Sequence, residues 1–283
     1  MATIQTLAPL SVLLGLLSAL SWGTGDFCGG MATKRSSAYS VVMAAQFIGA
    51  MLLVGLALVA DEPLPTPQGL TVAVAAGIAG VIGLGALYQG LASGQMGVIA
   101  PLSAIVGGVV PILAALMTEG WPSATQMAGF GVALIAVWLL AGTGEFRADP
   151  RTLTLATIAG TGFGFYFVLI AQASGDNVYW TLSVARLAAA LFFLVVILIT
   201  HRPLAPRREA WGLVTMAGLA DAGGNLFFVL AAQAGRLDVA AVLASLYPGS
   251  TVFLAWIFLG ERLKRPQMIG VVAALSAVAL VAL

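Results

Sequence analysis

Three ionisable residues interrupt long apolar stretches of the chain: Asp26, Arg186 and Asp221. Aspartate carboxylates bind cations or protons, and an arginine can hold a carboxylate. A charge at the centre of a membrane-spanning helix costs about 2.5–3.5 kcal/mol on insertion scales, and such residues usually face the protein interior. The functional interpretation is therefore a polar binding site. The alternative is a buried ion pair between Arg186 and one aspartate that fixes helix register.

Both aspartates have small residues at helical spacing. Gly29 lies three positions after Asp26, and Gly218 lies three positions before Asp221. Residues three or four apart share one face of a helix, and small residues let helices approach closely. We expect Asp26 and Asp221 to line a cavity or a close helix contact. For Arg186 we expect a structural charge.

Uncharged polar and aromatic residues in the apolar stretches are further candidates for substrate binding. They are Tyr88, Gln89, Tyr166, Asn225, Phe228, Ser245 and Tyr247. A tyrosine in such a stretch is as often an anchor at the membrane interface as a ligand contact. Glu119 and Glu261 each end an apolar stretch. We expect these two to be structural charges that cap loop amides or pair with arginines.

The sequence contains no recognisable catalytic or metal-binding set. It has no HExxH motif, no P-loop and only one cysteine, Cys28. We therefore predict no catalytic residues, metal site or cofactor. The net charge of +1 gives no support for nucleic-acid binding. Without an ATP-binding unit, any transport would use a gradient or substrate exchange.

The composition identifies the class of protein. Of 283 residues, 60% are hydrophobic and 8% are charged, and the mean hydropathy is +1.04. Soluble domains carry about 25% charged residues, so this is an integral membrane protein. Helices need about 20 apolar residues to cross a bilayer. Runs of that kind predict ten spans at 10–32, 38–60, 68–91, 97–118, 124–142, 152–173, 178–200, 209–233, 238–259 and 266–283.

The chain repeats itself. Gln126–Ala141 returns as Gln267–Ala282, 141 positions later, and both copies open with Gln-Met-x-Gly. Nearly the same offset pairs further small residues: Gly77 with Gly218, Gly83 with Gly224, and Ala45 with Ala185. We predict two repeats, 1–146 and 147–283, each of five spans. Because five is odd, the copies must be inverted, as in secondary transporters that bind substrate between their halves near the midplane.

Several short motifs mark both copies. The second contains Leu259-Gly260-Glu261-Arg262-Leu263, then Gln267 and Gly270, and the first contains Pro111, Glu119, Gln126 and Gly129. With Trp22-Gly23 and Arg186, they resemble the EamA-type transporters of the drug/metabolite transporter superfamily, over essentially the whole chain. The first copy departs from this pattern, because Gly120-Trp121-Pro122 replaces the Arg-Leu after the glutamate.

The resemblance implies an inner-membrane carrier, often an exporter of amino acids, metabolites or drugs. It also implies that spans 1, 3, 4, 6, 8 and 9 line a central cavity and that spans 5 and 10 are peripheral.

Basic residues favour one orientation. Ten fall in connections on one side of the predicted membrane: Lys34, Arg35, Arg147, Arg151, Arg202, Arg207, Arg208, Arg262, Lys264 and Arg265. The opposite side has only Arg236. The positive-inside rule makes the basic side cytoplasmic, which puts both termini outside. The family resemblance favours termini inside, and we follow the charges.

We therefore expect an all-α, ten-span secondary transporter that exports a small organic solute across the inner membrane by alternating access. Protons are a candidate coupling ion, and both a monomer and a homodimer remain open. Two alternatives are a membrane-embedded enzyme acting on lipids and a non-transporting membrane assembly subunit.

Overall fold

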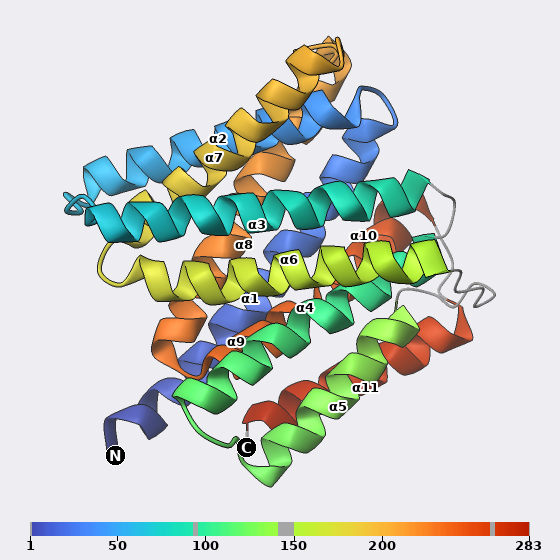
Figure 1. The fold of residues 1–283 in the computed structure, drawn as a ribbon. Helices are drawn as coiled ribbons and strands as arrows, with labels where there is room; N and C mark the ends of the chain where they lie inside the picture. The colour runs from blue at the N-terminus through green and yellow to red at the C-terminus, as the bar shows by residue number, and fades with distance from the viewer. Residues whose placement is uncertain (1, 93–95, 141–149, 261–263, 283) are drawn as a thin grey trace.

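The computed structural model describes residues 2–92, 96–140, 150–260 and 264–282, with side chains for 9–87, 102–140, 150–260 and 264–282. These described residues form α-helices and one short 3-10 helix, and no strands (Figure 1). The elements are α1 (Ala2–Thr33), α2 (Ala38–Val59), α3 (Pro67–Ala92), α4 (Met96–Thr118), α5 (Ala124–Leu140), α6 (Pro150–Ser174), α7 (Val178–Ile199), η1 (Arg208–Ala210), α8 (Trp211–Ala234), α9 (Leu237–Ala244), α10 (Tyr247–Leu259) and α11 (Arg265–Ala282).

The predicted all-α, multi-pass class is confirmed. Within the described residues, eight helical segments are long and apolar enough to cross a membrane, and two shorter apolar helices cover Leu102–Thr118 and Ala124–Leu140. These ten segments correspond to the ten predicted stretches. Helix α5 has only 17 residues, whereas Leu102–Thr118 is the part of the 23-residue α4 whose side chains the structure describes. The count of ten spans therefore stays a prediction.

One predicted span, 238–259, is divided into two helices, α9 and α10. Pro248 explains the break, because proline has no N–H and its ring clashes with the carbonyl four residues earlier, here Ala244. The chain instead makes a tighter turn. Leu246 N–H donates to the Leu243 carbonyl at 3.2 Å, and the Ser245 hydroxyl donates to the Val242 carbonyl at 2.7 Å.

The two copies pack against each other reciprocally. Helix α1 packs on α8 and α3 on α6, while α2 pairs with α7 and α5 with α11. In Figure 1 the α2/α7 and α5/α11 pairs lie at opposite edges, with the other helices between them. The repeat matches α1 with α6, α2 with α7, α3 with α8 and α5 with α11. Under this matching the α1/α8 contact becomes the α6/α3 contact, and the α2/α7 and α5/α11 contacts become themselves. A pseudo-two-fold relation between the copies produces this pattern.

The glycines show the same reciprocity in detail. A methyl group at Gly218 of α8 would meet the Ala45 carbonyl oxygen of α2 at 2.6 Å. At Gly77 of α3 it would clash with the Ala185 carbonyl of α7. These are the residues that the sequence repeat pairs, Gly77 with Gly218 and Ala45 with Ala185. Glycine is required because the helix backbones approach this closely.

Candidate functional site

An ion pair joins α7 and α8 near the middle of the bundle. Arg186 Nη2 donates to Asp221 Oδ2 at 2.8 Å, and Arg186 Nη1 donates to Gln46 Oε1 of α2 at 2.9 Å. The Arg186 side chain is only 3% exposed, whereas that of Asp221 is 34% exposed. Arg186 is thus held by two neighbours, and Asp221 keeps one side open.

Asn225 and Tyr166 extend this network. Asn225 Nδ2 donates to the Asp221 carbonyl oxygen at 2.7 Å and lies 3.4 Å from Asp221 Oδ1. The Tyr166 hydroxyl of α6 donates to Asn225 Oδ1. Four helices, α2, α6, α7 and α8, therefore meet in one chain of polar side chains. It brings together the candidates Asp221, Asn225 and Tyr166 with Arg186.

Sequence reasoning missed Gln46. A single glutamine in an apolar helix carries no periodic signal. However, Gln46 precedes Arg186 by 140 positions, the same offset that pairs Ala45 with Ala185. It is the repeat counterpart of Arg186, and the reciprocal packing of α2 and α7 brings the two side chains together. Comparing the polar residues of the two copies would have identified it.

The network lies deep in the predicted membrane region. Asp221 stands ten positions after the first residue of α8, Trp211, and thirteen before the last, Ala234. A helix rises 1.5 Å per residue, so Asp221 is about 15 Å from the nearer end of α8. That is the depth at which secondary transporters place their binding sites.

Asp26 lies beside this network but does not join it. Its neighbour Gly25 packs on α8, where an added methyl group would lie 3.5 Å from Asp221 Cβ. The Asp26 side chain is exposed, and among the described side chains it makes no hydrogen bond or ion pair. Its carboxylate interacts electrostatically with Asp221 and Tyr247. Arg186 pairs with Asp221 alone, so the Asp26 carboxylate has no counter-charge among the described side chains.

An aromatic cluster adjoins the polar network. Trp22 stacks on Phe167 with ring centroids 5.4 Å apart, and Phe167 lies 4.8 Å from Phe228. The candidate Phe228 is fully buried in this cluster. Trp22 lies one helical turn before Asp26 on α1, so the aromatic cluster begins on the same face of that helix as the carboxylate.

The remaining candidates lie outside the hydrogen-bonded network, although Tyr247 lies close enough to Asp26 to interact electrostatically with its carboxylate. Ser245 is buried at the break between α9 and α10, where its hydroxyl bonds to the Val242 carbonyl. Tyr247 begins α10 and is partly buried. The side chains of Tyr88 and Gln89, and all of Glu261, fall outside the described residues.

The end of the bundle that contains Glu119, here called the Glu119 end, is tied together by charged groups. Both Glu119 carboxylate oxygens accept the Leu237 N–H at 3.2 Å, which caps the start of α9. Arg236 donates to the Gly120 carbonyl at 2.8 Å and to both oxygens of the buried Asp238 at 3.0 and 2.7 Å. Burial raises the pKa of Glu119, and the hydrogen bond to Asp238 raises the pKa of Arg236.

The two ends of the bundle differ in packing. Every residue of α9, which starts at the Glu119 end, is buried. No residue of α10, which continues the same predicted span toward the connection with α11, is buried. Because α9 and α10 are halves of one expected membrane crossing, the other helices cover this crossing fully at the Glu119 end and only partly toward the other end. We call the second end the basic end, after Lys34, Arg207 and Lys264.

The sequence of both copies matches a known family. Residues 9–142 and 151–283 each match the EamA-like transporter family. The chain belongs to the EamA-like transporter family. The predicted resemblance is therefore confirmed over both repeats, and the chain is a multi-pass membrane protein of a transporter family.

Solved structures agree with this EamA-like fold. One crystal structure, described only as "Crystal structure of protein", is 16% identical and has a TM-score of 0.82. The match covers 96% of this chain and 98% of that chain. At that identity it supports the shared fold alone. A comparison with curated proteins found no match.

Proposed function

We propose that this EamA-like protein exports a small organic solute across the inner membrane by alternating access. The two halves, 1–146 and 147–283, would be inverted five-helix repeats that rock about the polar network between them. The reciprocal packing of α2 with α7 and of α1 with α8 supports this motion, because symmetric contacts can be exchanged between two equivalent states.

The observation that carries the proposal is the uncompensated carboxylate of Asp26 beside the Arg186–Asp221 pair. An exposed carboxylate within a membrane helix costs free energy unless a cation or a proton meets it. We infer that Asp26 binds a proton or the ammonium group of the solute. Trp22 and Phe167 would contact the solute's apolar part, since aromatic faces also attract cations.

The described conformation supports a state closed at the Glu119 end and accessible from the basic end. By the charge distribution the basic end is cytoplasmic, so this state would take up solute from the cytoplasm. Release on the other side requires α9 to separate from Glu119. The cap on the Leu237 N–H would be lost in that step, and the repeat counterpart of this contact would form at the basic end.

The test is transport by the purified protein in lipid vesicles. A panel of amines, amino acids and neutral metabolites would be presented with and without a pH gradient, and counterflow of each compound measured. Asp61, an exposed carboxylate outside the helices, supplies the matched control. We expect Asp26→Asn to lose transport of at least one class that the wild type and Asp61→Asn both carry. Equal transport by all three proteins, or none for any compound, would contradict the proposal.

A further inference from the structure

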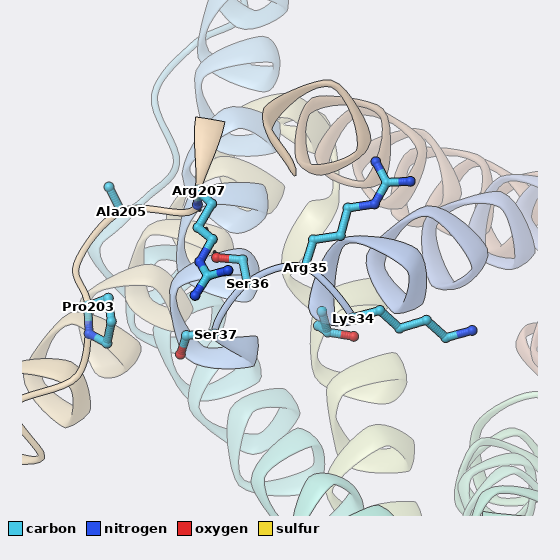
Figure 2. Close-up of a pocket in the computed structure, with 8 residues that line it drawn as sticks. Lys34, Arg35, Ser36, Ser37, Pro203, Ala205 and Arg207 are labelled. Carbon is cyan, nitrogen blue, oxygen red and sulfur yellow. Dashed lines mark hydrogen bonds between the residues drawn. The ribbon is translucent and has the colours of Figure 1, made fainter. Parts of the chain in front are cut away.

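A basic pocket lies at the basic end, away from the polar network. It has a volume of about 340 Å³ and lies between the α1–α2 turn and the segment that joins α7 to α8 (Figure 2). Its lining residues are Thr33, Lys34, Arg35, Ser36, Ser37, Pro203, Ala205 and Arg207. The first five residues come from the first repeat, and the last three come from the second.

The charges of this pocket are all positive. Lys34, Arg35 and Arg207 line it, no acidic residue does, and none of the three pairs with an acid among the described residues. Figure 2 shows the Arg207 guanidinium beside Ser36 and Ser37, whereas the Lys34 and Arg35 side chains extend from the same turn away from Arg207. These three cations make the surroundings of the pocket positive, and the Arg207 guanidinium is the one that lies beside the serines. A positive field of this kind favours an anion next to Arg207.

Hydrogen-bond donors are available at the same place. The Ser37 hydroxyl oxygen is buried, and within the described part of the chain it has no hydrogen-bond partner. Ser37 immediately precedes α2 in an extended conformation and does not cap that helix with its side chain. The free N–H groups of a helix's first turn favour anions. Leaving a buried hydroxyl unpaired is unfavourable, so a bound acceptor would remove that cost.

We propose that this pocket binds a phosphate group, either in the head group of an anionic phospholipid or in a soluble phosphate ester. A phosphate has several acceptor oxygens, which suit the Arg207 guanidinium and the Ser37 hydroxyl together. Basic pockets between helices on the cytoplasmic side of membrane proteins bind such head groups. The bound phosphate would bridge Ser37 of the first repeat and Arg207 of the second at the end opposite Glu119.

The test uses purified full-length protein in nanodiscs of phosphatidylcholine, with or without phosphatidylglycerol, and measures the thermal unfolding midpoint and retained lipid by mass spectrometry. Arg207→Gln is compared with Arg208→Gln, which removes the same charge from an adjacent residue that does not line the pocket. We expect phosphatidylglycerol to raise the unfolding midpoint of the wild type and of Arg208→Gln. Arg207→Gln should need about fivefold more of the lipid for the same rise in midpoint. Equal responses of the two variants would overturn the proposal.

A second variant separates phosphate binding from folding. Ser37→Ala removes a buried, unpartnered hydroxyl, so the phosphate-free protein should unfold at an equal or higher temperature, while its response to phosphatidylglycerol weakens. An unchanged response would count against the site. Glycerol phosphate and inorganic phosphate, added to the phosphatidylcholine nanodiscs, distinguish the sources. Stabilisation by these soluble probes would indicate a phosphate ester, and stabilisation by phosphatidylglycerol alone would indicate a lipid head group.

Discussion

The carboxylate of Glu119, just after α4, accepts the backbone N–H of Leu237, the first residue of α9, with both oxygens at 3.2 Å. The bond joins the two sequence copies at the closed end of the bundle. An acid placed at a helix start is doubly favourable, because it satisfies a free N–H and the positive end of the helix dipole. This cap acts together with the bond from Arg236 to the Gly120 carbonyl, and a single substitution of Glu119 removes the cap alone.

The first prediction concerns this cap. Glu119→Ala should weaken closure of the Glu119 end by about 0.5–2 kcal/mol, the usual cost of losing a helix cap. A cysteine at Ala114, which is partly buried and lines a pocket with Glu119 and Leu237, should then react several-fold faster with a membrane-impermeant thiol reagent in a Cys28→Ser background.

Glu62→Ala is the matched control for the first prediction. The Glu62 carboxylate caps α7 by accepting the Tyr179 and Trp180 N–H groups at 3.1 and 2.8 Å. It does so at the edge of the bundle, so its loss should leave labelling at position 114 unchanged. Equal labelling in the wild type and Glu119→Ala would disprove the role of the cap.

The second prediction is a pH dependence of the same closure. Burial raises the pKa of Glu119 above its ordinary value of 4.5, although the Leu237 N–H and Arg236 act in the opposite direction and Asp238 adds to the rise. The Glu119 carboxylate therefore binds a proton more tightly when the end is closed than when opening exposes it to water. The proton on Glu119 stabilises the closed end fully below pH 4.5, and this stabilisation is lost as the pH rises through the raised pKa of Glu119.

Labelling of the cysteine at position 114 against pH measures this dependence. It should increase as the pH rises above 4.5 in the wild type. Glu119→Gln, which is neutral at every pH, should give a flat profile after correction for the reagent's own pH dependence. A wild-type profile that is also flat, or that falls with pH, would rule out the titration of Glu119.

The repeat made much of the fold predictable. The offset that pairs Gly77 with Gly218 and Ala45 with Ala185 corresponds to real reciprocal contacts between helices. The predicted spans also lie close to the observed helices, because apolar length and turn residues are local signals. The break before Pro248 is explained by proline chemistry only once the structure shows it, because Pro111 lies within the continuous α4. The different burial of α9 and α10 was not predictable either, because it depends on which other helices pack against each half, which no local pattern encodes.

The site was predictable only in part. Asp221 and Asn225 lie one turn apart on one helix, so their proximity followed from spacing. The choice between Asp26 and Asp221 as the partner of Arg186 depended on how α1, α7 and α8 pack, and the sequence could not decide it. The structure assigns the ion pair to Asp221.

The third prediction separates charge from packing in that ion pair. Asp221→Asn keeps an oxygen acceptor for Arg186, so the protein should fold, but transport should be abolished or greatly slowed. Asp221→Ala leaves the buried Arg186 without its counter-charge, which costs about 3–5 kcal/mol for a buried pair. Thermal unfolding in detergent and vesicle transport measure the two effects.

Adding Arg186→Gln to Asp221→Ala should recover part of the lost stability, because no unpaired charge then remains. If Asp221→Asn transports normally at every pH, Asp221 does not take part in the transport cycle. If Asp221→Ala is as stable as the wild type, the ion pair contributes nothing to folding.

The fourth prediction concerns orientation. The basic residues place Lys264 in the cytoplasm and Asp61 outside. Cysteines at these positions, in a Cys28→Ser background, should differ in whole cells: an impermeant thiol reagent should label position 61 strongly and position 264 only after the membrane is permeabilised. Both residues flank helices, so neither substitution disturbs the core. Strong labelling of position 264 in intact cells would reverse the predicted topology.

The fifth prediction assigns energy coupling to Asp26. Asp221 already forms an ion pair with Arg186, whereas Asp26 has no ion-pair or hydrogen-bond partner among the described side chains. A proton bound by Asp26 would remove the repulsion between the two carboxylates, and its release on one side of the membrane would link the cycle to a gradient. Asp26→Asn should therefore lose accumulation driven by a pH gradient and retain exchange of solute across the membrane.

The competing explanation is that Asp26 only balances Lys34 or Arg35 at the end of α1. In that case Asp26→Asn should preserve both activities and change only expression or orientation. Vesicles loaded with solute and assayed with and without a pH gradient separate the two explanations, with Asp61→Asn as a control for loss of a surface carboxylate. Coupling would be supported if Asp26→Asn retains exchange of solute but loses accumulation, while Asp61→Asn retains both. Proton-driven accumulation that survives in this variant would exclude it, because no other uncompensated carboxylate lies next to the Arg186–Asp221 pair among the described residues.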